Sequence, residues 1–138
     1  MNNKFLLGGI IGGVTCFIIG YLIYGLAIGS MLSEGTMAGV SKPMEQYNWA
    51  LLIIGNLASG FLLSYILTKS GTLGFGGGAM MGAVVGLLMA LSFDCIMYAT
   101  SNMYTDLKTV IIDVIGYMVL MAVGAGAVGA YLGTGKKA

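Results

Sequence analysis

Four long apolar runs constrain this chain of 138 residues more than any other feature of the sequence. The runs cover residues 5–29, 49–67, 75–98 and 110–132. An apolar helix of about 20 residues crosses a bilayer, and the chain is only 8% charged, whereas soluble domains carry about 25% charged residues. The sequence therefore predicts a single all-α domain over residues 1–138, with four transmembrane helices in a tightly packed, glycine-rich bundle.

Four spans place both termini on the same side of the membrane. The lysines divide unequally between the two sides, with Lys4, Lys69, Lys136 and Lys137 on the side of the termini and Lys42 and Lys108 on the other. Because cytoplasmic loops are enriched in lysine and arginine, we expect cytoplasmic termini and an external loop over residues 30–48. Tyr98 and Tyr104 are among the aromatic residues assigned to the outer membrane interface.

The charged residues argue against several functional classes. All cationic side chains are lysines, and histidine is absent. The chain therefore lacks the arginine fork that reads phosphates and bases and the imidazole that serves as a base or zinc ligand. We expect no nucleic-acid partner, no cofactor, no metal and no enzymatic activity. Cys16 and Cys95 lie inside apolar runs and are interpreted as small buried hydrophobic residues.

Small residues recur at helical spacing along the runs, among 24 glycines in all. The predicted packing positions are Gly8, Gly12, Gly78, Gly82, Gly86, Ala90, Gly126, Gly129 and Gly133. In lipid, such ridges let two helix backbones approach closely and gain dispersion contact. Either all of them pack within the chain, or some pair with a second copy or another membrane protein.

Two aspartates interrupt the apolar runs, where a carboxylate costs roughly 2.5 kcal/mol or more at the helix centre. Asp94 lies about one turn before the end of its run and Asp113 about one turn after the start of the next. The two therefore share a depth, and the short connection predicts that their helices are adjacent. The expected polar cluster consists of Asp94, Asp113 and Asn56, with Tyr98, Tyr117 and Asn102 as hydrogen-bonding neighbours.

Three interpretations of this cluster compete. In the first, each aspartate forms hydrogen bonds across helices and holds the bundle together. In the second, the carboxylates and an amide oxygen receive a cation or a proton from outside. In the third, the cluster contacts a partner chain or a lipid headgroup. An Asp-to-Asn change should be tolerated by the first role and should abolish a site that depends on charge.

Short patterns in the chain resemble a group of small four-helix bacterial membrane proteins. They are Ser92 to Tyr98 with the following Ala99-Thr100-Ser101-Asn102, Asp113, Gly55-Asn56-Leu57, Tyr24-Gly25 and the glycine-rich last run. The group is mostly seen in Bacteroidetes and is classed as a domain of unknown function. The resemblance implies a bacterial inner-membrane protein with four spans, and it implies no activity, substrate or catalytic residue.

The sequence favours a non-enzymatic packing or accessory protein in the lipid bilayer. Such a protein would self-associate as a homo-oligomer or join other membrane protein subunits through its small-residue ridges. The alternative is a minimal oligomeric cation channel, or a transporter coupled to protons or cations, that uses Asp94 and Asp113.

Overall fold

The computed structural model describes residues 3–135, and this part of the chain is helical without strands. Its long helices are α1 (Asn3–Gly20) with its continuation η1 (Tyr21–Ala27), α3 (Trp49–Ser70), α4 (Phe75–Thr100) and α5 (Leu107–Gly133). These four segments are long and apolar enough to cross a membrane. The predicted all-α class is confirmed, and the four helices agree in number with the four predicted spans of a multi-pass membrane protein.

The helix bounds differ from the apolar runs where capping chemistry intervenes. The last helix begins at Leu107 rather than residue 110, because the Asp106 side chain accepts a hydrogen bond from the backbone N–H of Thr109 at 2.8 Å. Such a cap satisfies a donor that the first turn leaves free. The predicted external loop contains two short helices, α2 (Gly29–Gly35) and η2 (Met44–Gln46).

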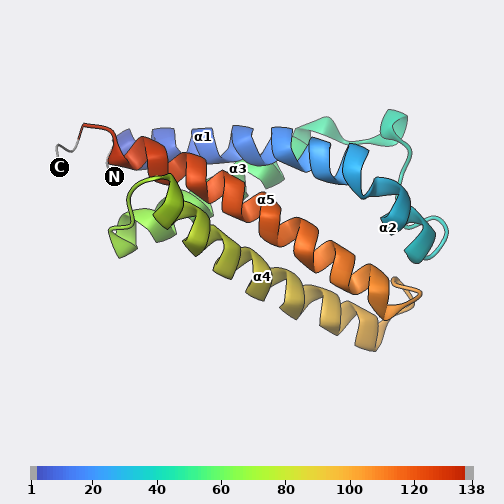
Figure 1. The fold of residues 1–138 in the computed structure, drawn as a ribbon. Helices are drawn as coiled ribbons and strands as arrows, with labels where there is room; N and C mark the ends of the chain where they lie inside the picture. The colour runs from blue at the N-terminus through green and yellow to red at the C-terminus, as the bar shows by residue number, and fades with distance from the viewer. Residues whose placement is uncertain (1–2, 136–138) are drawn as a thin grey trace.

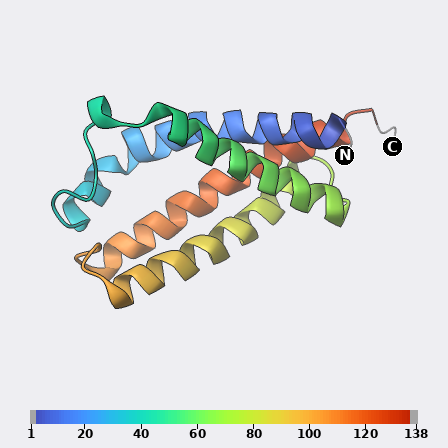
Figure 2. The ribbon, with the colours of Figure 1, turned by 180° about the vertical axis from the view of Figure 1, so that it is seen from behind.

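Helix α5 is the centre of the bundle and buries more residues than any other helix. It packs against α4 along its length and also contacts α1 and α3, which pair with each other (Figure 1). Helices α3 and α4 meet at their short connection and then diverge, as the view from behind shows (Figure 2). The fold therefore consists of two helix pairs, α1 with α3 and α4 with α5, joined through α5.

The α4–α5 contact runs along the row of glycines on α4. A Cβ atom at Gly82 would meet the carbonyl oxygen of Met121 and the Cβ of Ala125. At Gly86 it would lie 2.7 Å from the Met121 Cβ, and Ala90, next in the row, is 7% exposed. The two backbones are therefore close enough that this face of α4 has room for hydrogen or a methyl group only.

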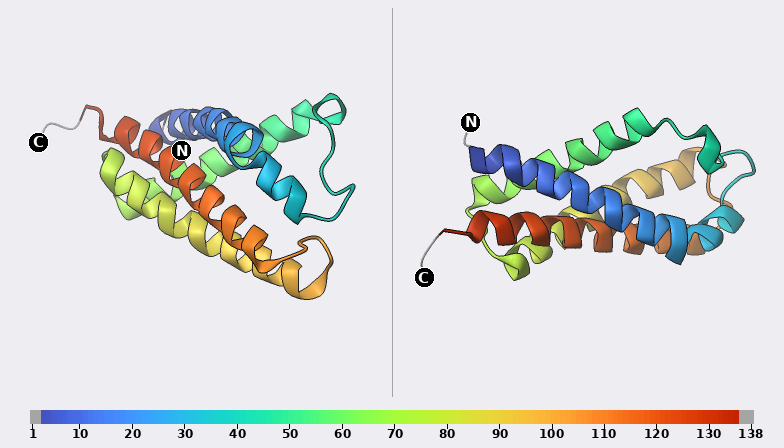
Figure 3. Two further views of the ribbon diagram at one scale, coloured as in Figure 1. Left: turned by 45° about the vertical axis from the view of Figure 1, so that its right-hand side comes forward. Right: turned by 90° about the horizontal axis from the view of Figure 1, so that it is seen from above.

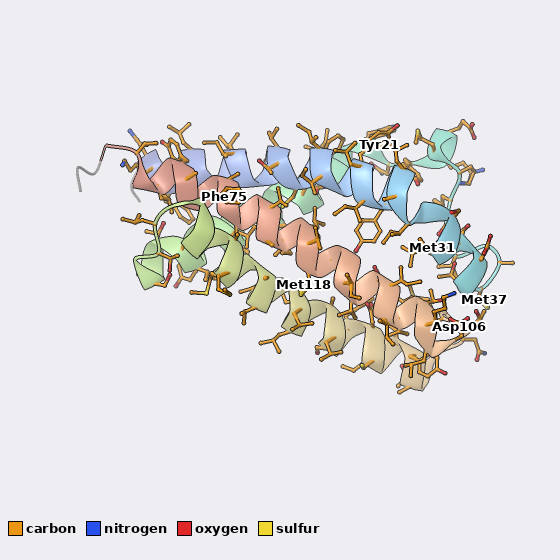
Figure 4. All side chains as sticks on the ribbon, viewed as in Figure 1. Tyr21, Met31, Met37, Phe75, Asp106 and Met118 are labelled. Atoms are coloured by element: carbon orange, nitrogen blue, oxygen red, sulfur yellow. The ribbon has the colours of Figure 1, made fainter. Side chains whose placement is uncertain are left out.

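The other predicted packing positions also face segments of the same chain. Gly12 on α1 lies against Gly60 of α3, whose Cα would be 3.0 Å from an added Cβ, and Gly8 lies against Ser64. A Cβ at Gly126 would be 2.6 Å from the ring of Phe75, labelled at the start of α4 in Figure 4. The remaining predicted packing positions likewise contact their own chain, namely Gly78 with Ala125, Gly129 with Gly74 and Gly133 with Gly74.

Both described ends of the chain lie at one end of the bundle, which Figure 1 shows on the left. The Lys4 ammonium donates to the backbone carbonyl of Thr134 at 2.7 Å and joins the first helix to the last. In the α3–α4 connection, Gly71 and Gly74 have φ of 70° and 82°, a conformation that favours glycine. Lys136 and Lys137, used in the orientation argument, lie outside the described residues.

The opposite end of the bundle is closed by a short pairing between distant segments. Residues 35–37, here called the strap, begin at the last residue of α2 and lie beside residues 103–105 of the α4–α5 connection. The N–H of Met37 donates to the carbonyl of Met103 at 2.9 Å, and the N–H of Thr105 donates to that of Gly35 at 2.8 Å. Figure 3 shows the two loops together at this end. The strap therefore holds the α4–α5 connection by backbone hydrogen bonds on either side of Tyr104.

The Asp106 cap predicts a pH dependence of folding. The Thr109 hydroxyl and backbone N–H donate to this exposed carboxylate and hold its pKa below the ordinary 3.8. A group with a depressed pKa stabilises the fold above its unfolded pKa, and this stabilisation is lost as pH falls through the folded pKa. The thermal midpoint of the wild type should therefore fall relative to that of Asp106→Asn below about pH 4, since asparagine caps without titrating. A difference between the two midpoints that is the same at all pH values would contradict this account.

Candidate functional site

The two intramembrane aspartates meet through a third side chain, Tyr104. Its hydroxyl lies 2.9 Å from Oδ1 of Asp94 on α4 and 2.8 Å from Oδ2 of Asp113 on α5. Asp94 is 2% exposed and Tyr104 is 5% exposed, while Asp113 is half-buried. The α4–α5 connection thus turns back into the bundle and places a phenol between two carboxyl groups. We call these three residues the acid pair and its bridging tyrosine.

A count of hydrogens shows what this arrangement requires. A tyrosine hydroxyl carries one hydrogen, and an ionised carboxylate can only accept. Tyr104 can therefore donate to Asp94 or to Asp113, and the other contact needs a hydrogen on the carboxyl group. Both short contacts are satisfied as hydrogen bonds when the pair holds one proton.

One oxygen of the acid pair, Oδ2 of Asp94, does not form a hydrogen bond in the described chain. It is buried and has no hydrogen-bond partner among the described residues. Leaving a buried polar group unpaired costs about 1–3 kcal/mol, and such groups are few in native proteins and call for an explanation. The described chain therefore leaves one oxygen of the acid pair without its hydrogen bond.

Tyr104 is held by its surroundings as well as by the acid pair. The N–H of Met103 donates to the Ser101 hydroxyl at 3.2 Å, and the strap pairs with the residues on either side of Tyr104. In Figure 4, Met37 of the strap and Asp106 mark this end of the bundle. Burial, together with the hydrogen bonds and charges of Asp113 and Asp94, raises the pKa of Tyr104 far above its usual range. Its hydroxyl is therefore a donor at physiological pH.

A cavity of about 440 Å³ opens beside the acid pair. Its walls come from α4, α5 and their connection and are mostly apolar. The lining residues are Met89, Ala90, Phe93, Asp94, Met103, Tyr104, Asp113 and Tyr117. Asp94 and Asp113 are the only carboxylic acids among these lining residues, so they form an acidic end to a mostly apolar space.

The first span contributes to the site through a π-helical segment. In η1 the chain forms wider turns, seen in the hydrogen bond of 2.9 Å from the Ile28 N–H to the Ile23 carbonyl. The Tyr24 hydroxyl lies 3.4 Å from the backbone carbonyl of Asp113. Gly116 on α5 leaves space for this approach, because a Cβ there would be 2.7 Å from Ile28. Segments of this kind often occur at functional sites.

The structure separates Asn56, Tyr98 and Asn102 from the acid pair and keeps Tyr117 beside it. Asn56 donates to the carbonyl of Leu52 in its own helix at 2.8 Å and lines a different cavity, of about 240 Å³. Tyr117 lines both cavities and stands between them. Tyr98 is 42% exposed, and Asn102 is exposed in the connection. Divergence of α3 from α4 explains the position of Asn56.

Sequence reasoning missed Tyr104, which it assigned to the membrane interface. The only sequence signal was its place as the aromatic residue of a short connection between the two aspartate-bearing spans. Met103 was missed as well, although it lines the cavity. Neither position could be assigned without the path of the connection, which the strap determines.

Side chains of the kinds that bind divalent metals do not gather at this site within the described part of the chain. Among residues 3–135, no group of three or more His, Cys, Asp and Glu side chains lies together in a way that could hold a metal ion. The Tyr104 hydroxyl also occupies the space between the carboxyl groups, where a shared metal ion would bind.

Protein-family models, curated proteins and solved structures were compared with the chain, and none matched.

Proposed function

We propose that this chain is a non-enzymatic bacterial inner-membrane protein that binds and releases a proton at Asp94 and Asp113 and couples that step to transport. The observation that carries the proposal is the single Tyr104 hydroxyl, which lies 2.9 Å from the Asp94 carboxyl and 2.8 Å from that of Asp113. The proposed topology has four spans with cytoplasmic termini, so that the acid pair lies toward the outer surface.

The depth of the acid pair supports proton exchange from one side of the membrane. Asp94 lies six residues before the end of α4 and Asp113 six residues after the start of α5, which corresponds to about 9 Å along each helix. Ionisable residues within spans are costly and commonly mark ion or proton pathways. A purely structural acid pair would be expected to satisfy all its oxygens, whereas Oδ2 of Asp94 has no partner in the described chain.

The test is infrared difference spectroscopy of the purified protein in lipid during a pH titration. The wild type should show a protonated carboxyl band that disappears as pH rises. Asp94→Asn and Asp113→Asn should each abolish or shift that band, because either change removes one member of the pair. Asp106→Asn is the matched control, since this aspartate is exposed and outside the pair. A wild-type band that is absent, or that survives in both variants, would refute the proposal.

The open side of the bundle favours a second candidate, an accessory protein that pairs with a membrane partner. Helices α3 and α4 diverge, and their surfaces carry large apolar side chains such as Ile54, 59% exposed, and Leu88, 60% exposed. A second copy or another subunit could fill this side. Purification from the native membrane in mild detergent, followed by mass determination, tests it. Other proteins in fixed ratio, or a closed homo-oligomer, would support this candidate, and a lone monomer would refute it.

A further inference from the structure

We propose that the cavity beside the acid pair binds an organic cation, a quaternary ammonium or phosphonium with an apolar or aromatic body. The inference rests on the proposed function and names the ligand class that exchanges with the proton. The size of the cavity fits a small organic ligand. The cavity measures about 440 Å³, whereas one water molecule takes about 30 Å³ of liquid and pockets for small organic ligands measure about 300–1,000 Å³.

The chemistry of the walls matches the two parts of such a ligand. Thioether and aromatic surfaces line the cavity, and they come from Met89, Met103, Phe93 and Tyr117. Thioethers adapt to varied apolar shapes, and aromatic faces attract quaternary ammonium groups. The acid pair supplies the negative charge, and Oδ2 of Asp94 is buried beside the cavity with no hydrogen-bond donor against it among the described residues.

Access to the cavity is lateral, from the lipid-facing surface of α4. Phe93 and Met89 at its edge are 57% and 43% exposed, whereas Asp94 is 2% exposed. An amphiphilic cation dissolved in the bilayer would therefore meet the apolar rim first and reach the carboxyl groups from within the cavity. A small hydrated ion would have no comparable reason to enter between these side chains.

Proton and organic cation compete for the same negative charge. With one proton bound the pair carries one negative charge, and without it two. The other ionisable groups that face the pair are phenols, namely Tyr104 from the connection, Tyr117 from α5 and Tyr24 from η1. Cation binding should therefore strengthen as pH rises, by up to about tenfold per pH unit when one proton is displaced.

Equilibrium dialysis of radiolabelled tetraphenylphosphonium with the full chain in maltoside micelles tests the inference, with empty micelles as the blank. Maltoside carries neither charge nor ammonium group. Asp94→Asn should weaken binding at least about tenfold. Phe93→Ala should weaken it several-fold without affecting the fold, because Phe93 is largely exposed. Ile96→Ala is the matched control, being 58% exposed on the same helix and outside the cavity lining.

The outcomes separate the two proposals. A carboxyl band that titrates normally, with no probe binding above the blank, would overturn this inference and leave the proposed function standing. Binding that is equal in the wild type, Asp94→Asn and Phe93→Ala would also overturn it. Added phosphatidylcholine that displaces the probe would support a lipid quaternary ammonium as the natural ligand. Failure to displace the probe would support a free amphiphilic cation.

Discussion

Tyr104→Phe is expected to destabilise the fold by about 3 kcal/mol, since each buried group left without its partner costs about 1–3 kcal/mol. The change removes the one hydroxyl that joins α4 to α5 at this level. Two carboxyl groups would then face each other in an apolar cavity without the phenol that bridges them. Unfolding in mixed micelles with increasing denaturing detergent measures the difference in free energy.

Tyr98→Phe is the control for this measurement. Tyr98 lies near the same end of α4 but is 42% exposed, so its loss of a hydroxyl should change stability by no more than about 0.5 kcal/mol. Equal stability of Tyr104→Phe and the wild type would show that the acid pair does not depend on the bridging phenol. The count of hydrogens at the site would then need another donor.

Gly82→Ile is expected to be the most disruptive single change in the α4–α5 contact. A side chain at Gly82 would point into the Met121 carbonyl and the Ala125 Cβ. Because those are a backbone atom and the first atom of a side chain, the clash cannot be relieved by a rotamer change. Overpacking of a tight contact costs about 1–3 kcal/mol and occasionally more, and we expect a loss at or above the upper figure.

Gly76→Ile provides the matched comparison on the same helix. A Cβ at Gly76 has no neighbour within 4 Å, so the same added volume meets no other segment of the described chain. The free energy of unfolding, measured as for Tyr104→Phe, should be lower for Gly82→Ile than for Gly76→Ile. Similar values for the two variants would show that the α4–α5 separation is not set by the glycine row.

The depth of the acid pair could be predicted from the sequence, and its bridging residue could not. Helical rise is constant, so the distance of Asp94 and Asp113 from the ends of their runs translates directly into a shared level. Rotation about each helix axis and the path of a connection depend on packing. Tyr104 enters the bundle because the strap, far away in sequence, pairs with residues on both sides of it.

Asn56 was predicted at the acid pair from its depth, and the structure places it elsewhere. Its depth was consistent with the acid pair, but α3 diverges from α4 and Asn56 donates to its own helix at Leu52. Equal depth is therefore a necessary condition for contact and not a sufficient one. To predict which helices are neighbours, one must know which of their small-residue faces pack together.

By itself the sequence determined the all-α membrane class, the four spans and the level of the two aspartates, because apolar length and helical rise are local properties. Tertiary structure alone decided that α5 is the central helix, that α3 and α4 separate, and that Tyr104 stands between the carboxyl groups. These features depend on contacts between segments distant in sequence. In lipid, the arrangement of the helices is determined by the packing of small-residue faces and by interhelical hydrogen bonds.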